Sequence, residues 1–398
     1  MKTGFGDVDE RGTISGTDES DLDLLREAVR KVASGGIAPE VAGMERSGKM
    51  PDAVFKALLG TDFHAASIPA RYGGAGAGAL EAVVVIEEVA RVSAAASVIP
   101  AQGFVASCAL GMAEPDSEQA SVLSAIAGGE LLAATPMAGS GAGGVDARAG
   151  GAGWILEGAL EWVPWPYASA GAALVAEVRT ENGPALLVHR LRGGEDGADE
   201  AASMLGFRGV PLRRLRLTGL EVPAGAIAPG GGGRQVMQWR AVRLIATAAQ
   251  ATGTAVMALE AAQAYVRERR QFGRAIGDFQ ALRVMLAEMA TRTESARRLT
   301  YAAAEAIGSS VGPEVLRLAA SAKLHATDVA MGVATDAVQL FGGYGFMKDY
   351  PVERAMRDAK MTQLLAGDRL EQQCVIADIL ARSGAAASLD GADPGPGW

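Results

Sequence analysis

One glycine-ended segment in the second half of the chain carries side chains suited to an anionic ligand. It reads Glu268-Arg-Arg-Gln-Phe-Gly273 and is followed by Asp278-Phe-Gln280. A diphosphate requires a charge-assisted donor such as Arg269, with polar partners such as Gln271 and Gln280 beside it. The same pattern is equally typical of an ordinary helix that ends in basic residues and stops at a glycine.

A second segment, Gln339-Leu-Phe-Gly-Gly343, ends in a pair of glycines. Because glycine has no side chain, Gly342 and Gly343 would let a ligand approach the backbone closely. A glycine pair on its own is weak evidence, since many helices end this way. Its value depends on what surrounds it.

The run from Gln339 to Lys360 closely resembles the C-terminal signature of acyl-CoA dehydrogenases, including the closing Asp-Ala-Lys. In that family the run leads into Ile-Tyr-Glu-Gly-Thr, whose Glu is the catalytic base. The matching stretch here, with no gap, is Leu364-Leu-Ala-Gly-Asp368. Ala366 therefore stands in place of the base, and it cannot take a proton.

The nearest carboxylates in the sequence are Asp368 and Glu371, two and five residues beyond Ala366. At these offsets we expect both side chains to point away from the position of the missing base. The sequence thus predicts no catalytic residue, and Asp368 is kept only as a candidate substitute.

The resemblance also implies that FAD is the cofactor. In the family, the segment matching residues 268–273 holds the FAD diphosphate of the neighbouring subunit, and the segment matching residues 339–343 meets the adenine and diphosphate. The spacing between the two segments matches the family as well. The implied FAD contacts in this half of the chain are Arg269, Gln271, Phe272, Gln280, Gln339, Phe341, Gly342 and Gly343.

Residues 131–140 resemble the family segment Leu-Thr-Glu-Pro-x-Ala-Gly-Ser, which meets the isoalloxazine ring of the flavin. Ser140 is retained and is an implied FAD contact, whereas Ala134 replaces the Thr and Thr135 the Glu. The resemblance therefore predicts fewer polar contacts to the ring.

Residues 158–164 resemble Gly-x-Lys-x-Trp-Ile-Thr in the same family. Trp162 is implied to pack against the flavin, while Pro164 replaces a hydroxyl residue near its reactive edge. Proline has neither an N–H nor a hydroxyl to donate. The alternative for Trp162 is an ordinary core aromatic on a strand.

A third departure lies at Arg240-Ala-Val-Arg-Leu244. The family usually has an Arg at the position of Leu244, where it supports the acyl-CoA and the base. A minority of the family places its catalytic Glu one residue earlier, at the position of Arg243. This alternative base is missing too.

The composition restricts the classes of partner. A net charge of −9 argues against nonspecific nucleic-acid binding. Two separated cysteines and three histidines make a metal site improbable and fit a reducing cytosol. The acidic start of the chain is unlike a signal peptide, and the apolar run from Leu244 to Leu259 suits a buried helix better than a membrane span. We expect a cytoplasmic protein without a membrane span.

The elements that must position these residues fall into three domains. Residues 20–130 show helical periodicity, residues 131–235 hold short apolar runs separated by Gly and Pro, and residues 236–383 return to long helices. Residues 1–19 and 384–398 are expected to be disordered tails. The prediction is an α+β fold with an N-terminal helical domain, a central β domain and a C-terminal four-helix bundle, the order found in acyl-CoA dehydrogenases.

Three functions follow from the resemblance and its losses. The first is the base-lacking subunit of a heteromeric acyl-CoA dehydrogenase that completes the FAD site of a related Glu-bearing subunit. The second is a repurposed flavin-dependent biosynthetic enzyme, either an oxygenase or one performing a redox-neutral step. The third is a non-catalytic relative. The implied partners are an acyl-CoA or other acyl thioester, a homo- or hetero-oligomer with a related subunit, and electron transfer flavoprotein if dehydrogenation occurs.

Overall fold

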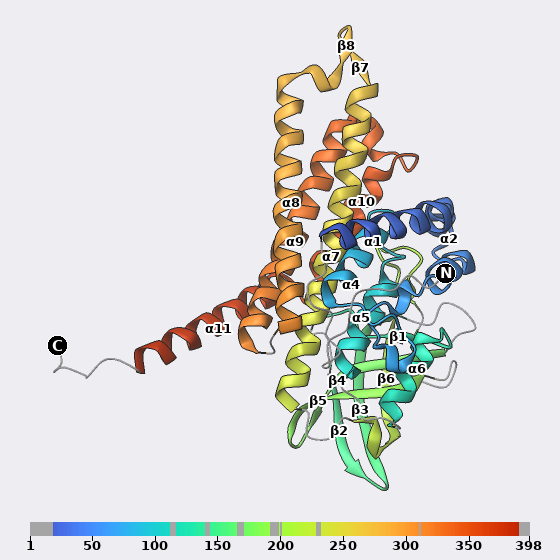
Figure 1. Cartoon of the computed structure of the whole chain (residues 1–398), viewed down its shortest axis with the longest axis vertical. Coiled ribbons are helices and arrows are strands. Elements are labelled where there is room, and N and C mark those ends of the chain that lie inside the picture. The colour runs from blue at the N-terminus through green and yellow to red at the C-terminus, as the bar shows by residue number, and fades with distance from the viewer. Residues whose placement is uncertain are drawn as a thin grey trace, which may run out of the picture.

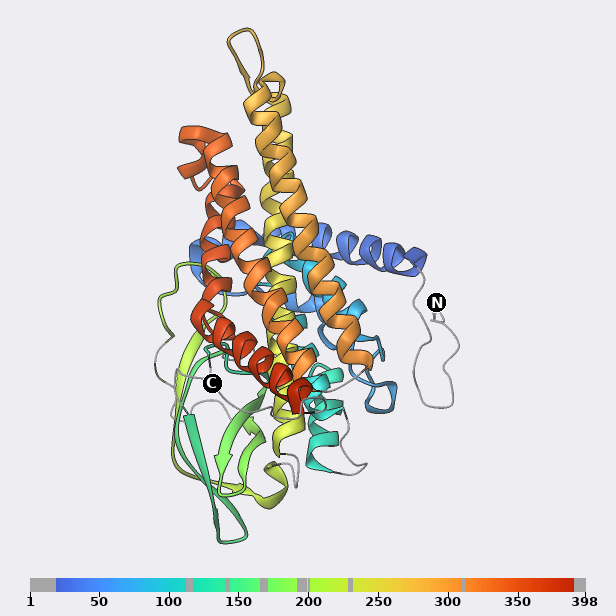
Figure 2. The same ribbon diagram turned by 90° about the vertical axis from the view of Figure 1, so that its left-hand side faces the viewer.

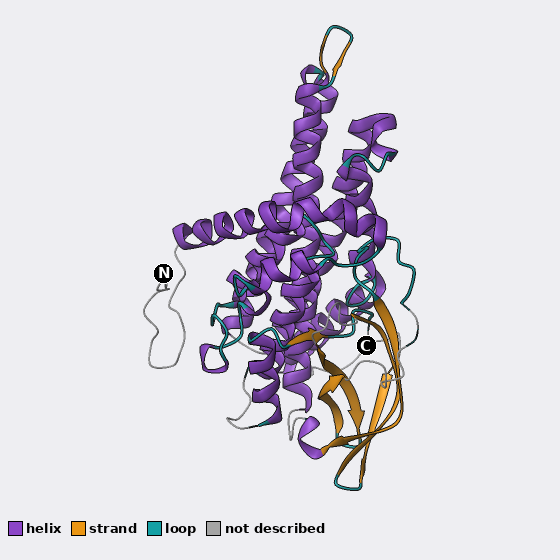
Figure 3. Cartoon of the chain, turned by 90° about the vertical axis from the view of Figure 1, so that its right-hand side faces the viewer, coloured by secondary structure: helices purple, strands orange, loops and turns teal. Residues whose placement is uncertain are grey.

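Helices, then strands, then helices again follow one another along the chain in the computed structural model (Figure 1). The structure describes residues 19–111, 117–139, 144–164, 171–191, 199, 201–227, 232–309 and 312–389. The strands of the large sheet gather at one end of the molecule, and a small hairpin marks the opposite end (Figure 3). The predicted α+β class and the order of its parts are confirmed.

The N-terminal part is helical and packs against the long C-terminal helices. In its first helix, Leu22 and Val29 are buried, while Arg30 and Lys31 in the last turn suit the negative end of the helix dipole. Ser117 caps the last helix by accepting a hydrogen bond from the backbone N–H of Ala120 at 3.1 Å. These helices are α1 (Glu19–Val32), α2 (Val41–Ser47), α3 (Asp52–Leu59), α4 (Ala79–Ala90), α5 (Val98–Leu110) and α6 (Glu118–Ala127).

The central part is a six-stranded sheet with the order β1-β4-β2-β3-β6, in which β5 pairs with β4. Its strands are β1 (Leu131–Ala134), β2 (Gly144–Gly150), β3 (Gly153–Pro164), β4 (Gly171–Thr180), β5 (Gly183–Leu191) and β6 (Leu212–Pro223). The register between β3 and β6 shifts between Leu160 and Val163, so Trp162 lies in a bulge with φ of 53°. The bulge turns this side chain out of the regular alternation of the strand.

The C-terminal part is built on four long helices that run side by side (Figures 1 and 2). They are α7 (Gly232–Glu268), α8 (Gln280–Ser309), α9 (Pro313–Phe341) and α10 (Pro351–Leu364). The hairpin of β7 (Arg270–Gln271) and β8 (Arg274–Ala275) joins α7 to α8. Helix α11 (Arg369–Leu389) leaves the bundle at an angle and continues past residue 383, where the sequence led us to expect the helical part to end.

Helix α7 is long and apolar enough to cross a membrane, as it has a mean hydropathy of 1.3 over its most apolar window. However, 89% of that window is buried inside the protein. It is therefore the central helix of the fold, packed against α4, α5, α8, α9 and α10, and it passes from the sheet end to the hairpin end of the molecule (Figure 1).

Candidate functional site

The turn that follows α10 holds the residue aligned with the missing base. Ala366 is 8% exposed and has a left-handed backbone with φ of 54°, a conformation that favours glycine. Its backbone N–H donates to the carbonyl oxygen of Met137 at 2.8 Å. This bond ties the turn to the loop after β1, residues 135–139.

A buried lysine fixes the same turn from the other side. Lys323, on α9, is 1% exposed, and its Nζ donates to the carbonyl oxygen of Gln363 at 3.0 Å and to that of Gly367. Burial lowers the pKa of the Lys323 ammonium to about 8, while the charges of Glu371 and Asp368 act in the opposite direction. The Gln363 carbonyl lies in the last turn of α10, where helix acceptors have no partner within the helix, and the Gly367 carbonyl lies in the turn that follows.

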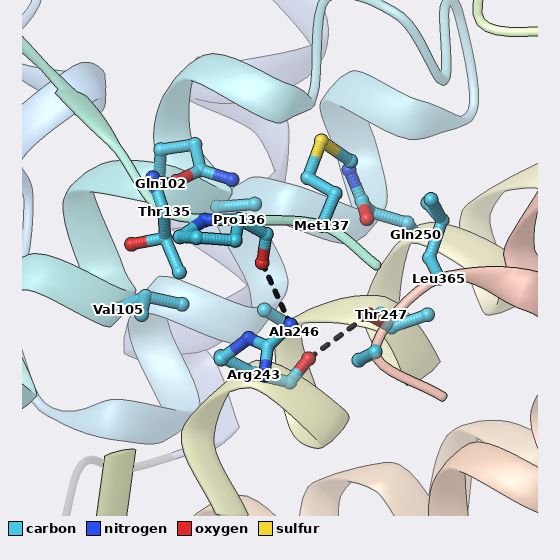
Figure 4. Close-up of a pocket in the computed structure, with 12 residues that line it drawn as sticks. Gln102, Val105, Thr135, Pro136, Met137, Arg243, Ala246, Thr247, Gln250 and Leu365 are labelled. Carbon is cyan, nitrogen blue, oxygen red and sulfur yellow. Dashed lines mark hydrogen bonds between the residues drawn. The ribbon is translucent and has the colours of Figure 1, made fainter. Parts of the chain in front are cut away.

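Arg243 of α7 reaches the loop after β1 from below. Its Nη2 donates to the carbonyl oxygen of Pro136 at 2.6 Å (Figure 4) and to that of Ala138 at 2.7 Å. The guanidinium also lies 4.5 Å from the centre of the Trp239 ring. Leu244, by contrast, is buried in the core, so the register of α7 places Arg243, and not its neighbour, at the site.

A small cavity lies between these groups. It is lined by Ala101, Gln102, Val105, Thr135, Pro136, Met137, Arg243, Ala246, Thr247, Gln250, Leu365 and Ala366 (Figure 4). About 20 Å³ of it is open to the centre of a water-sized sphere, which is enough for roughly one water molecule. None of the described residues that line it is a carboxylic acid.

The two acids nearest to Ala366 in the sequence do not line this cavity. Asp368 is exposed, and its Oδ1 accepts a hydrogen bond from the backbone N–H of Glu371 at 2.9 Å, so it caps the start of α11. The Glu371 carboxylate lies against backbone: a Cβ added to Gly139 would meet its Oε2 at 2.5 Å and the Cα of Gly367 at 2.7 Å. Only glycines allow the loop and the turn to meet so closely.

Trp162 lies beside the turn. Its carbonyl oxygen accepts a hydrogen bond from the backbone N–H of Met137 at 3.0 Å, and its ring packs against a cluster that includes Met137, Met361 and Leu365. Ala134 and Pro164, at the two positions where the resemblance implied hydroxyls, provide none. Ser140 lies outside the described residues.

The signature run on α10 anchors this region to the β domain. Asp358 is 2% exposed, and its Oδ1 accepts a hydrogen bond from the backbone N–H of Phe207 at 2.7 Å. Phe207 itself has φ of 55°. Burial raises the pKa of the Asp358 carboxyl to about 6, against the opposing influence of Arg354. The Asp-Ala-Lys motif thus has a structural role that its sequence alone did not reveal.

A second pocket, of about 400 Å³, lies at the hairpin end of the bundle. Its lining combines rings, glycines and donors: Tyr265, Arg269, Gln271, Ile276, Leu340, Phe341, Gly342, Gly343, Tyr344 and Met347. Tyr265 and Phe341 stack with their centroids 4.0 Å apart, and the Arg269 guanidinium lies 5.3 Å from the centre of the Tyr344 ring. A Cβ added to Gly342 or Gly343 would meet nothing within 4 Å.

The structure therefore brings together five of the eight residues that the sequence implied for this half of the cofactor, namely Arg269, Gln271, Phe341, Gly342 and Gly343. The other three do not line the pocket. Gln280 and Gln339 are exposed, and Phe272 is 91% exposed at the tip of the hairpin, where its ring contacts Phe279 edge to face. These three side chains therefore do not contribute to the hairpin-end pocket of their own chain.

The fit of these groups to FAD differs between the two regions. At the hairpin end, a guanidinium, an amide and open glycine backbone suit the diphosphate, and the stacked rings suit an aromatic base. At the turn, Trp162 could pack on a flavin ring, but the backbone N–H groups of Met137 and Ala366 already donate to other carbonyls. Thus the diphosphate half fits well and the isoalloxazine half fits only in part.

The two regions also lie far apart within one chain. From Arg243 to the end of α7 at Glu268 the helix rises about 38 Å, at 1.5 Å per residue, and Figure 1 shows the hairpin at the end opposite the sheet. The ribityl chain that joins the two halves of FAD has five carbon atoms. It is far too short to connect both regions of one chain.

Among the described residues, no group of three or more His, Cys, Asp or Glu side chains is placed to hold a metal ion. Sequence reasoning missed Lys323 altogether and named Arg243 only as the position of the alternative base, because each side chain acts on backbone carbonyls that are distant in the chain. No local pattern around either residue signals such a contact.

Comparisons with known proteins agree with the sequence motifs and the geometry. The family models described as "Acyl-CoA dehydrogenase, N-terminal domain" and "Acyl-CoA dehydrogenase, C-terminal domain" match residues 19–130 and 230–380. The chain is 37% identical to the probable acyl-CoA dehydrogenase FadE25 of Mycobacterium tuberculosis, over 90% of this chain and 95% of that protein. It is 29% identical to the caffeyl-CoA reductase-Etf complex subunit CarC of Acetobacterium woodii, over 90% of this chain and 98% of that protein.

Among solved structures, the butyryl-CoA dehydrogenase of Megasphaera elsdenii superposes with a TM-score of 0.81 at 26% identity, covering 93% of this chain and all of that one. The sheet between two helical parts and the long central helix are thus shared along nearly the whole chain. Both family models and the relatives lead to one conclusion: this chain belongs to the acyl-CoA dehydrogenase family of FAD-binding oxidoreductases.

Proposed function

We propose that this chain is the base-lacking subunit of a heteromeric acyl-CoA dehydrogenase. In this role it lends its hairpin end to the FAD of a related subunit, which carries the catalytic Glu. The oxidised substrate is an acyl thioester, and the assembly works in the cytoplasm.

The observation that carries the proposal is the difference between the turn around Ala366, which has lost its base, and the hairpin-end pocket, which has kept its cofactor-binding groups. The turn has Ala366 in place of the base, and no described residue lining its cavity is an acid. The hairpin-end pocket keeps its guanidinium, amide and glycines. General base catalysis contributes about 10²- to 10⁴-fold in rate, so a chain that retains cofactor-binding groups without a base is better suited to support another active site than to run its own.

The surface around the hairpin-end pocket supports an oligomer. Four large apolar side chains there are exposed: Phe272 at 91%, Phe346 at 80%, Met347 at 45% and Tyr344 at 40%. Apolar side chains gathered in this way are typical of an interface. A related subunit seated on this surface would bury them and bring its own isoalloxazine region close to Arg269.

Within such an assembly, FAD supplies the hydride acceptor for oxidation of the acyl group. Arg269 and Gln271 would hold the diphosphate by hydrogen bonds, and the Gly342–Gly343 backbone would allow close approach. Electrons would leave through electron transfer flavoprotein, a proposal supported by the similarity to a subunit of an Etf complex.

The test is the flavin content of the chain alone and of the chain co-purified with its nearest Glu-bearing homologue. We expect a colourless, inactive protein alone, and near one FAD per pair with acyl-CoA dehydrogenase activity in the mixture. One FAD per chain in the protein alone would contradict the shared site and indicate a self-sufficient flavoenzyme with other chemistry. A mixture that forms no complex would also overturn the proposal.

A further inference from the structure

Arg243 is a mostly buried cation whose guanidinium bonds to backbone carbonyls. Its two hydrogen bonds go to the carbonyl oxygens of Pro136 and Ala138, and no salt bridge joins it to a carboxylate within the described ranges. Glu371 and Glu177 act on it only through space, and burial lowers the pKa of the guanidinium to about 10. It therefore remains charged at neutral pH, and burial makes that charge costly unless an anion pairs with it directly.

The guanidinium lies between two cavities. The small cavity beside Ala366 and a larger one, of about 270 Å³, share Pro136 and Arg243 in their linings. The larger cavity extends between the sheet and α7, and its charged lining comprises Glu161, Glu177, Arg179, Arg240 and Arg243, with Arg240 paired to Glu177. A ligand entering through the larger cavity would meet Arg243 before it reached the turn.

The small cavity is also more polar than a hydrocarbon chain requires. The backbone N–H of Thr135 donates to Gln102 Oε1 at 2.6 Å. This bond fixes the orientation of the Gln102 amide, so that its Nε2 donor faces the cavity lined by Thr135, Pro136 and Met137 (Figure 4). An amide donor and a guanidinium thus border a space of about 20 Å³, too small for a fatty chain.

We propose that Arg243 and Gln102 form a site for the carboxylate of a short acyl thioester, such as a malonyl group. One carboxylate oxygen occupies the space of the small cavity beside Gln102, and the thioester arm lies in the larger cavity. The Arg243 guanidinium forms an ion pair with the carboxylate, which compensates its buried charge. The Gln102 amide N–H donates a hydrogen bond to the carboxylate oxygen in the small cavity. A longer unsubstituted acyl chain offers neither the charge nor the size that this space accepts. The inference rests on the proposed function only for the thioester class of ligand, and it does not require turnover or FAD.

The test measures binding to the full-length protein by isothermal titration calorimetry, using malonyl-CoA, propionyl-CoA, octanoyl-CoA and free malonate. Because a buried charge-assisted bond is involved, we expect malonyl-CoA to bind about tenfold or more tightly than propionyl-CoA, and octanoyl-CoA to bind no better than propionyl-CoA. Equal affinity for malonyl-CoA and propionyl-CoA would overturn the proposal. Malonate binding as tightly as malonyl-CoA would overturn the thioester part.

Two variants locate the site. Arg243→Met should remove the preference, so that malonyl-CoA binds no more tightly than propionyl-CoA to this variant. Gln102→Glu keeps the acceptor for the Thr135 N–H but replaces the donor with a negative charge, so it should also remove the preference; it decides the matter if Arg243→Met fails to fold. Arg267→Met, at an exposed position on the same helix, is the control and should bind like the native chain. A preference that survives in Gln102→Glu refutes the site.

Binding is independent of flavin content, so failure here and failure of the shared-FAD proposal are distinguishable. If the chain pairs with a Glu-bearing homologue but binds malonyl-CoA no better than propionyl-CoA, the proposed function stands and this inference is wrong. The reverse result would keep the ligand site and lose the pairing.

Discussion

Replacement of Arg269 by methionine should weaken FAD binding in the assembly without unfolding the bundle. The side chain lines the hairpin-end pocket, stands over the Tyr344 ring, and forms no salt bridge to any described residue. Its loss removes a charge-assisted hydrogen bond to the diphosphate, worth about 1.5–3 kcal/mol. This corresponds to FAD affinity lower by about 10- to 150-fold. Loss of the contact with Tyr344 should cost the fold itself no more than about 1 kcal/mol.

The assay is titration of FAD into the apo-assembly, followed by quenching of flavin fluorescence. Arg270→Met is the matched control, because Arg270 is the next residue, carries the same charge and is exposed outside the pocket lining. A general effect of charge would weaken FAD binding equally in both variants. If Arg269→Met binds FAD as tightly as the native assembly, or if Arg270→Met loses as much, the assignment of the diphosphate to this pocket is refuted.

Three further predictions concern the turn and its anchors. Ala366→Glu should leave the chain inactive when it is purified alone, because the hydroxyls implied at Ala134 and Pro164 are missing as well as the base. A gain of about 10²-fold or more in acyl-CoA oxidation would contradict this. The raised pKa of Asp358 means that the folded state binds its proton more tightly than the unfolded state. Relative to Asp358→Asn, the native chain should therefore lose about 3 kcal/mol of unfolding free energy as pH rises from about 4 to 6, as measured by urea denaturation; a constant difference would refute this. Lys323 is a base whose pKa is lowered in the folded state, so the unfolded state binds more protons than the folded state between pH 8 and 10.5. Over this range the native chain should gain about 3 kcal/mol of unfolding free energy relative to Lys323→Met in the same denaturation assay. Parallel profiles of unfolding free energy against pH would contradict a lowered pKa for Lys323.

The parts of the fold that sequence reasoning predicted are those with local signals. Apolar periodicity predicted the long helices, since α9 begins at Pro313 and ends just before Gly342, as helix start and stop signals indicate. The pocket residues Arg269 and Gly343 were found because motif and spacing placed them together. The helix ends use information carried within a few turns of the chain, whereas the placing of Arg269 near Gly343 rests on the family resemblance.

The parts that could not be predicted depend on contacts between distant segments. Arg243 bonds to carbonyls more than one hundred residues away, and Asp358 holds the N–H of Phe207 across a similar separation. The bulge that redirects Trp162 arises from pairing between β3 and β6. In each case the partner is a backbone group, which carries no residue-specific signal in the sequence.

The contact between Gly139 and Gly367 also determines when this region can form. The two glycines lie more than two hundred residues apart, yet their backbones touch, so the contact closes a very long loop and carries a large entropy cost until most of the chain has ordered. The sheet and the N-terminal helices can pack earlier, through contacts that are nearer in sequence. During synthesis the turn is made after the loop that follows β1 and after α7, so a nascent chain would expose that loop and the Arg243 charge until α10 docks. A chaperone or the partner subunit that binds this face early would meet backbone carbonyls that are still without their Arg243 hydrogen bonds.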